Sequence, residues 1–141
     1  MASPAPQPYA RGQMQAAVPV PTSPSVVIVD ADRRVRQSLS DVLRLAGGVE
    51  VLGSAGDVRA ALELIERHRP DVVVVDPRLP DVPAGIALLS GIRLAWPETR
   101  IVLTGWVGAE SPLPGPDLTF IAKSAPAAEF VAAVLEACFT V

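Results

Sequence analysis

Residues 71–76 read DVVVVD, and this stretch decides the fold class. A strand with one face in solvent alternates apolar and polar side chains, whereas an unbroken run of β-branched residues indicates burial on both faces. Strands of this kind are typical of parallel sheets that carry helices on both sides. The stretch therefore predicts the central strand of an α/β sheet.

Strand and helix patterns alternate along the rest of the chain. Further strands are predicted over residues 25–30, 49–55, 100–104 and 118–122. Helices are predicted after the capping residues Asp32 and Asp57, over about residues 84–95, and from Pro126 onward. The predicted inner faces hold Val35, Leu39, Val42, Leu43 and Ala46 in the first helix, and Ile86, Leu89 and Ile92 in the third. This alternation predicts a doubly wound domain with five parallel strands and right-handed crossovers.

Two segments depart from the alternation. Residues 1–24 hold six of the fifteen prolines and lack a strand or helix pattern, so we expect a disordered leader ahead of a domain over residues 25–141. Residues 105–117 are interrupted by glycine and proline. The helix of the fourth crossover is therefore predicted to be short or missing.

Composition narrows the class of protein. A chain of 141 residues suits one domain, and its net charge of -3 offers no basic stripe for nucleic acid. The sequence has neither an apolar run long enough to span a bilayer nor the pattern of a signal peptide. The single cysteine, Cys138, agrees with a reducing compartment. These features predict a cytoplasmic protein without membrane or direct nucleic-acid contacts.

Polar side chains stand where four of the predicted strands end, namely Asp30, Asp76, Thr104 and Lys123. In an open parallel sheet the carboxyl ends of the strands share one edge, where ligands bind. Two carboxylates there would favour a hard cation such as Mg²⁺, and a hydroxyl and an ammonium could hold phosphoryl oxygens. Each residue also has a plainer explanation: a loop or cap carboxylate, an ordinary strand threonine, a solvated lysine.

Four stretches resemble the receiver domain of response regulators, in the family's order: VVIVDADRRVR, PDVVVVDPRLPD, RIVLTG and FIAKSA, within residues 25–140. The resemblance implies a flavodoxin-like sheet of order 2-1-3-4-5 and a phosphoryl acceptor at Asp76. Thr104 and Lys123 would act on the phosphoryl group, and Thr104 and Phe120 would switch the output surface. Mg²⁺ would be held by Asp30, Asp76 and the backbone carbonyl of Arg78, with Asp32 as a further candidate.

Because no effector domain follows residue 141, we expect a stand-alone signalling domain, unless the chain is a fragment of a longer regulator. The resemblance further implies that it is not an enzyme beyond self-catalysed phosphoryl transfer and autodephosphorylation. Its partners would be a histidine kinase or phosphotransfer protein and a downstream protein, and it could form a homodimer.

The sequence departs from the family pattern around the expected pocket. The second acid after the first strand is displaced by one residue to Asp32, and Pro77, which lacks an N–H, follows the acceptor. The segment from Asp76 to Gly85 is one residue longer than usual. An atypical pseudo-receiver that binds a partner without phosphorylation therefore remains an alternative. A small-ligand binder or enzyme on the same scaffold is a third, although a glycine-rich phosphate loop is absent after the first strand.

Overall fold

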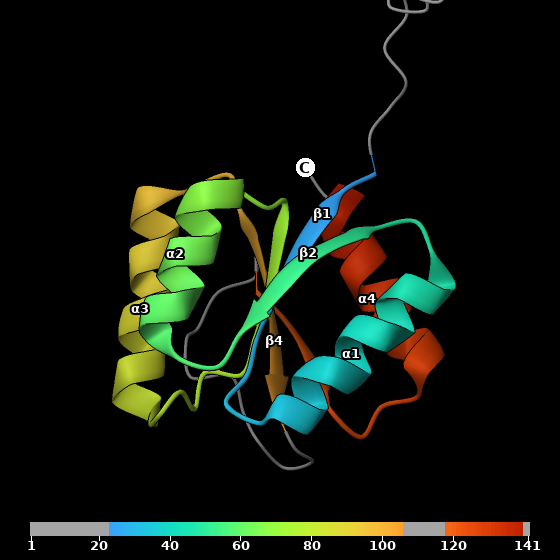
Figure 1. The fold of residues 1–141 in the computed structure, drawn as a ribbon, viewed down its shortest axis with the longest axis horizontal. Coiled ribbons are helices and arrows are strands. Elements are labelled where there is room, and N and C mark those ends of the chain that lie inside the picture. The colour runs from blue at the N-terminus through green and yellow to red at the C-terminus, as the bar shows by residue number, and fades with distance from the viewer. Residues whose placement is uncertain (1–22, 106–117, 140–141) are drawn as a thin grey trace, which may run out of the picture.

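The computed structural model describes residues 23–105 and 118–139 and contains a five-stranded sheet between two layers of helices (Figure 1). The elements are β1 (Ser25–Val29), α1 (Arg33–Ala46), β2 (Glu50–Ala55), α2 (Val58–His68), β3 (Val72–Val75), α3 (Val82–Ala95), β4 (Arg100–Gly105), β5 (Thr119–Ala122) and α4 (Ala127–Phe139). All neighbouring strands are parallel, in the order β2-β1-β3-β4-β5. The predicted doubly wound α/β fold is confirmed, with strand bounds within one residue of the predicted ones.

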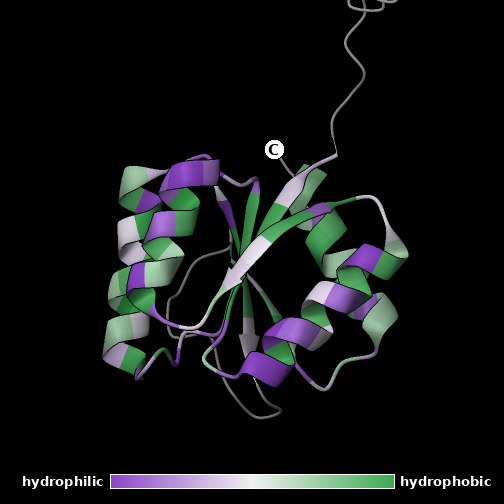
Figure 2. Ribbon diagram, in the orientation of Figure 1, coloured by the Kyte–Doolittle hydropathy of each residue, from purple (hydrophilic) through white to green (hydrophobic). Residues whose placement is uncertain are grey.

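The central strand β3 is buried on both faces, as its valines predicted. Val73 and Val75 belong to the hydrophobic core beneath α2 and α3, and Val72 and Val74 to the core beneath α1 and α4. None of the four is more than 1% exposed. Figure 2 shows the apolar strands gathered between the two helical layers. Burial of this run stabilises the middle of the sheet and places the residue after it, Asp76, at the sheet's carboxyl edge.

Helix α3 begins earlier than the predicted start near Ala84. The carboxylate of Asp81 accepts a hydrogen bond from the Ala84 backbone N–H at 2.9 Å and caps a helix that begins at Val82. Pro83 is compatible with the first turn because its missing N–H has no acceptor within the helix there. The earlier start therefore comes from Asp81, which the sequence analysis did not identify as a capping residue.

Two predicted helix faces need correction. In α1, Leu43 is fully buried as expected, but Ala46 is exposed because the chain turns away at Gly47, which has a φ of 75°. In α3, Leu88 is buried and was not predicted, whereas Ile86 is only half-buried. The buried stripe of α3 is thus rotated slightly from the predicted one.

Two predictions concern residues that lie outside the described part of the chain. Residues 1–22 include almost the whole of the expected leader, and residues 106–117 include the fourth crossover. Within the described ranges, no helix is both long and apolar enough to cross a membrane.

Candidate functional site

The four strand-end residues come from neighbouring strands of the sheet. Asp30 directly follows β1, Asp76 follows β3, Thr104 is the penultimate residue of β4, and Lys123 directly follows β5. Backbone hydrogen bonds fix two of these positions: Asp76 N donates to Val29 O at 3.0 Å, and Lys123 N donates to Gly105 O at 2.6 Å. The structure therefore brings the predicted residues to one edge of the sheet.

Lys123 joins the two carboxylates. Its Nζ lies 2.6 Å from Asp76 Oδ2 and 2.6 Å from Asp30 Oδ2. The side chains of Lys123, Asp30 and Asp76 are 5%, 3% and 10% exposed. Charges so well shielded from water must be paired to be tolerated, and one ammonium between two carboxylates leaves a net negative charge at the site.

The sequence singles out this lysine in another way. Lys123 is the only lysine among the twelve basic residues of the chain, the others all being arginines. Guanidinium groups serve solvent-exposed positions equally well, whereas a compact ammonium can approach two carboxylates from one point. The one lysine of the chain thus stands at the position where a compact point charge contacts two carboxylates.

The ion pairs shift the titration of Lys123. Burial by itself lowers the pKa of the ammonium, but the contacts with Asp30 and Asp76 and their negative charges outweigh it, so the pKa is raised above its ordinary 10.5. Because the folded-state value is the higher one, the stabilisation by these contacts is complete below pH 10.5 and is lost as the pH rises through the raised pKa.

We expect the ¹³Cε signal of Lys123, unique in a ¹³C-lysine-labelled sample, to titrate with a midpoint above 10.5 in the folded protein. The free energy of unfolding should fall over the same pH range. A midpoint at or below 10.5 would contradict the bridging geometry.

The second carboxylate oxygen of Asp76 is held by its own loop. Asp76 Oδ1 accepts a hydrogen bond from the Arg78 backbone N–H at 2.9 Å. Pro77 cannot donate, so the turn supplies its donor one residue later. The Arg78 side chain is exposed. The proline therefore does not leave the Asp76 carboxylate without a backbone donor.

Thr104 carries an unsatisfied hydroxyl. The residue is 2% exposed, and within the described residues its Oγ1 has no hydrogen-bond partner. A buried polar atom without a partner typically costs about 1–3 kcal/mol. A cavity of about 160 Å³ between α1 and α4 reaches Thr104 and Lys123. The hydroxyl thus makes no hydrogen bond within the described residues and lies next to this cavity.

Asp32 is placed differently from Asp30. Its exposed carboxylate caps α1 by accepting from the backbone N–H groups of Arg34 at 2.8 Å and Val35 at 3.4 Å. Asp30 Oδ1 in turn accepts from the Asp32 N–H at 2.8 Å. Within residues 23–105 and 118–139, no group of three acidic, histidine or cysteine side chains is close enough to hold a metal. The structure thus brings two of the three candidate acids together.

Phe120 lies in β5 and is half-buried against the core beneath α2 and α3. It is paired in register with Leu103, one residue before Thr104. The two candidate switch residues therefore belong to neighbouring strands.

Two contacts around the site were missed by the sequence analysis. Arg36 Nη1 donates to the backbone carbonyl of Asp30 at 2.7 Å and fixes the segment after β1. Gly85 packs directly on the loop of residues 76–81 that follows β3, since a Cβ there would lie 1.4 Å from Pro77 O. No feature of the sequence around Arg36 predicts its contact with Asp30. For Gly85, a glycine near the start of a helix and close in sequence to Asp76 indicates that another backbone segment approaches closely.

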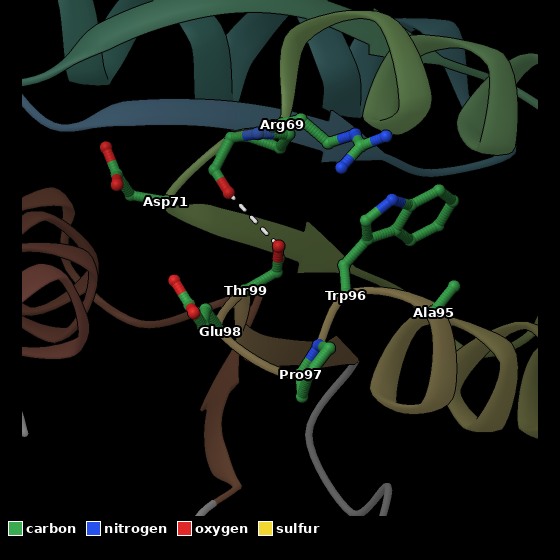
Figure 3. A pocket seen from close by; sticks show the side chains of 8 residues that line it. Arg69, Asp71, Ala95, Trp96, Pro97, Glu98 and Thr99 are labelled. Atoms are coloured by element: carbon green, nitrogen blue, oxygen red, sulfur yellow. Dashed lines mark hydrogen bonds between the residues drawn. The ribbon is translucent and has the colours of Figure 1, made fainter.

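A larger cavity, of about 310 Å³, lies at the opposite, amino-terminal edge of the sheet (Figure 3). There Arg69 lies over the Trp96 ring at 5.9 Å, and Thr99 Oγ1 donates to Pro70 O at 3.2 Å. Arg69 ends α2 with a φ of 46°, in the left-handed region. These contacts join the chain segments before β3 and β4. We therefore assign this region a structural role.

Comparison with known proteins agrees with the geometry. Residues 26–112 match the family model of the response regulator receiver domain. The chain therefore belongs to the response regulator receiver domain family, a family of two-component signalling proteins.

The relatives differ in overall length from this chain. It is 38% identical over 85 residues to the probable transcriptional regulatory protein NarL of Mycobacterium tuberculosis, covering 60% of this chain and 39% of that protein. It is 44% identical over 90 residues to protein-glutamate methylesterase/protein-glutamine glutaminase 5 of Anaeromyxobacter dehalogenans, covering 62% and 25%. The chain thus spans well under half the length of these relatives, and the activities in their names are not carried over to it.

Solved structures show the same architecture. The signal receiver domain of NarL from Mycobacterium tuberculosis superposes with a TM-score of 0.66 at 31% identity, covering 84% of this chain and 98% of that one. The response regulator domain of Thermotoga maritima CheB gives 0.73 at 24% identity, with coverage of 85% and 99%, and supports the fold alone.

Proposed function

We propose that Asp76 accepts a phosphoryl group from a histidine kinase or phosphotransfer protein. The observation that carries the proposal is the pairing of the Asp76 carboxylate with Lys123 at the edge where Thr104 presents an unsatisfied hydroxyl. In the transfer, a carboxylate oxygen attacks phosphorus and a P–O bond forms. The P–N bond of a phosphohistidine donor breaks, and its electron pair stays on the imidazole nitrogen.

The residues present divide the work that phosphoryl transfer needs. The Lys123 ammonium can form an ion pair with a negatively charged phosphoryl oxygen, and the Thr104 hydroxyl can donate a hydrogen bond to another. The Arg78 N–H keeps the Asp76 side chain oriented toward the edge of the sheet. The Thr104 hydroxyl would gain this hydrogen bond only when the phosphoryl group is present. The hydrogen bond would therefore stabilise the conformation in which Thr104 has moved toward the phosphoryl group. We propose that Thr104 and Phe120 then alter the surface around β4 and β5, which a downstream protein reads in the cytoplasm.

A divalent cation fits the donor set in part. Asp30 and Asp76 offer carboxylate oxygens, the Arg78 backbone carbonyl is the third protein ligand that the family resemblance implies, and Mg²⁺ commonly keeps several waters. When bound, Mg²⁺ would offset the negative charge of the phosphoryl oxygens. With Asp32 engaged in capping α1, only two acids remain, so we expect weak binding.

The metal prediction separates the two acids that follow β1. Asp30→Ala should abolish detectable Mg²⁺ binding by titration, because it removes one of two buried carboxylates. Asp32→Ala should leave Mg²⁺ affinity within about threefold while it destabilises the fold by about 1 kcal/mol through loss of the α1 cap. Equal loss of affinity in the two variants would show that Asp32 is a ligand instead.

One observation favours a second candidate function, a pseudo-receiver that binds a protein without phosphorylation. The second acid after β1, Asp32, caps α1 through hydrogen bonds from Arg34 and Val35, so Asp30 is the acid from this segment that pairs with Lys123. In that case Asp76 would be structural, and the surface over β4 and β5 would hold one conformation.

The two candidates are separated by phosphorylation with Mg²⁺ and acetyl phosphate, followed by intact-mass measurement. The wild type should gain one phosphoryl group, and Asp76→Asn should gain none, because the amide is not a competent nucleophile. An unlabelled wild type, under conditions where an ordinary receiver domain is labelled, would support the pseudo-receiver. A labelled Asp76→Asn would mean that another residue is the acceptor.

A further inference from the structure

A polar groove of about 260 Å³ lies between α1 and strand β2, far along the sheet from Lys123. Arg33, Arg36 and Arg44 line it from α1, together with the nearly buried Ser40, and Ser54 lines it from β2. Figure 1 shows β2 as the outermost strand, crossing the molecule between α1 and α2. The groove contains none of the residues proposed for phosphoryl transfer.

The arginines in the first turn are not explained by the stability of α1, whereas Arg44 in the last turn is favoured by the helix dipole. Arg33 and Arg34 occupy the first two positions of the helix, where its dipole disfavours cations. The helix carries four arginines and a single acid, Asp41. Within the described residues, Arg33 and Arg44 form no ion pair. Unpaired guanidinium groups along one side of a groove are suited to an anionic partner.

Strand β2 adds a second feature, an open sheet edge. It pairs with β1 alone in the described sheet. The Ala55 carbonyl accepts from Asp30 N, so the backbone groups of the preceding residue, Ser54, point away from β1. Edge strands are commonly protected by charged residues, proline or bulges. EVLGSA has no proline and no basic residue, and its one charged residue, Glu50, lies at the start of the strand. The register of β2 against β1 shifts between Val51 and Gly53, so residues 53–55 follow the irregularity and pair regularly with β1. The edge is thus open to an added strand.

We propose that this groove binds an extended acidic peptide of a partner protein, which adds to the sheet beside β2 and directs alternate carboxylates toward Arg33 and Arg44. Arg33 and Arg44 are separated by eleven residues, about 16 Å along a helix. An extended chain covers that length in about five residues, with alternate side chains on one face. A single phosphate would contact only one end of the row and would make no use of the β2 backbone, so the geometry favours a peptide.

The test is fluorescence anisotropy of the full chain with a labelled peptide of alternating Glu and Val. The double variant Arg33→Gln/Arg44→Gln should bind at least about tenfold more weakly, through the loss of two charge-assisted contacts. Arg34→Gln is a control matched to Arg33→Gln: each removes one positive charge from the first turn of α1, but Arg34 does not line the groove. Arg34→Gln should bind within about twofold of the wild type, whereas Arg33→Gln alone should already weaken binding. Arg36 is left intact because it holds the Asp30 carbonyl.

Two further peptides test the strand addition. A peptide of alternating Lys and Val should not bind, and a Glu-Val peptide N-methylated along its β2-facing edge should lose at least about tenfold in affinity. Absence of binding, equal binding by the double variant, equal binding of the N-methylated peptide, or full displacement by equimolar inorganic phosphate would each overturn the proposal. Unchanged affinity in Asp76→Asn is expected, so this test and that of phosphoryl transfer fail independently.

Discussion

Gly85→Ala is expected to destabilise the fold by on the order of 3 kcal/mol, because no other glycine with described surroundings lies so close to backbone atoms. The added Cβ would lie 1.4 Å from Pro77 O, 2.4 Å from Pro77 C and 2.9 Å from Pro77 Cα. These are backbone atoms, so relief requires α3 and the loop of residues 76–81 to separate. The substitution should therefore also disturb the Arg78–Asp76 hydrogen bond and slow labelling of Asp76.

Urea denaturation provides the measurement, and the same helix provides a matched control. Gly91 in α3 has no heavy atom within 4 Å of where a Cβ would stand. Gly91→Ala should stabilise the protein by about 0.5–1 kcal/mol, because alanine is the better helix former. If Gly85→Ala matched Gly91→Ala in stability, the close packing of the loop of residues 76–81 on α3 would be incorrect.

Lys123→Met should have an effect at least as large as Gly85→Ala, on stability and on chemistry together. Removing the ammonium leaves Asp30 and Asp76 as two uncompensated buried carboxylates, which typically costs about 3–5 kcal/mol. Loss of a preorganised cation next to the reacting oxygen should slow phosphoryl labelling by about a hundredfold.

Two further variants show whether the loss of stability comes from the specific ion pairs of Lys123 or from the removal of any positive charge. Asp30→Asn combined with Lys123→Met should recover part of the stability, because one of the unpaired charges is gone. Arg67→Met, which removes an exposed cation at the end of α2, should change stability by less than about 0.5 kcal/mol. A Lys123→Met protein as stable as the wild type would show that the ion pairs contribute little.

The sheet could be predicted from sequence because its signals are local. Four adjacent valines indicate burial on two faces without knowledge of any neighbour, and residues at the ends of parallel strands must share an edge. The same logic located Asp30, Asp76, Thr104 and Lys123. The capping role of Asp32 could also be predicted, because an acid directly before a helix is a common N-cap. The structure places Asp32 in that role.

Other features depend on how distant segments meet. The Gly85 contact exists because the loop after β3 folds back on α3, and the path of a loop leaves little trace in periodicity. Arg36 reaches the Asp30 carbonyl through a long flexible side chain whose direction sequence alone does not specify. The unsatisfied Thr104 hydroxyl likewise emerges only when its surroundings are known.

The central claim is phosphorylation of Asp76, and peptide mapping tests it most directly. After treatment with acetyl phosphate and Mg²⁺, borohydride reduction converts an aspartyl phosphate to homoserine, and trypsin cleavage after arginine places Asp76 in the peptide of residues 68–78. Asp30 and Asp32 fall in a separate peptide, residues 12–33. We predict homoserine at position 76 alone, dependent on Mg²⁺ and absent from Asp76→Asn. Homoserine at position 30 or 32, or none in a folded wild-type protein, would contradict the account.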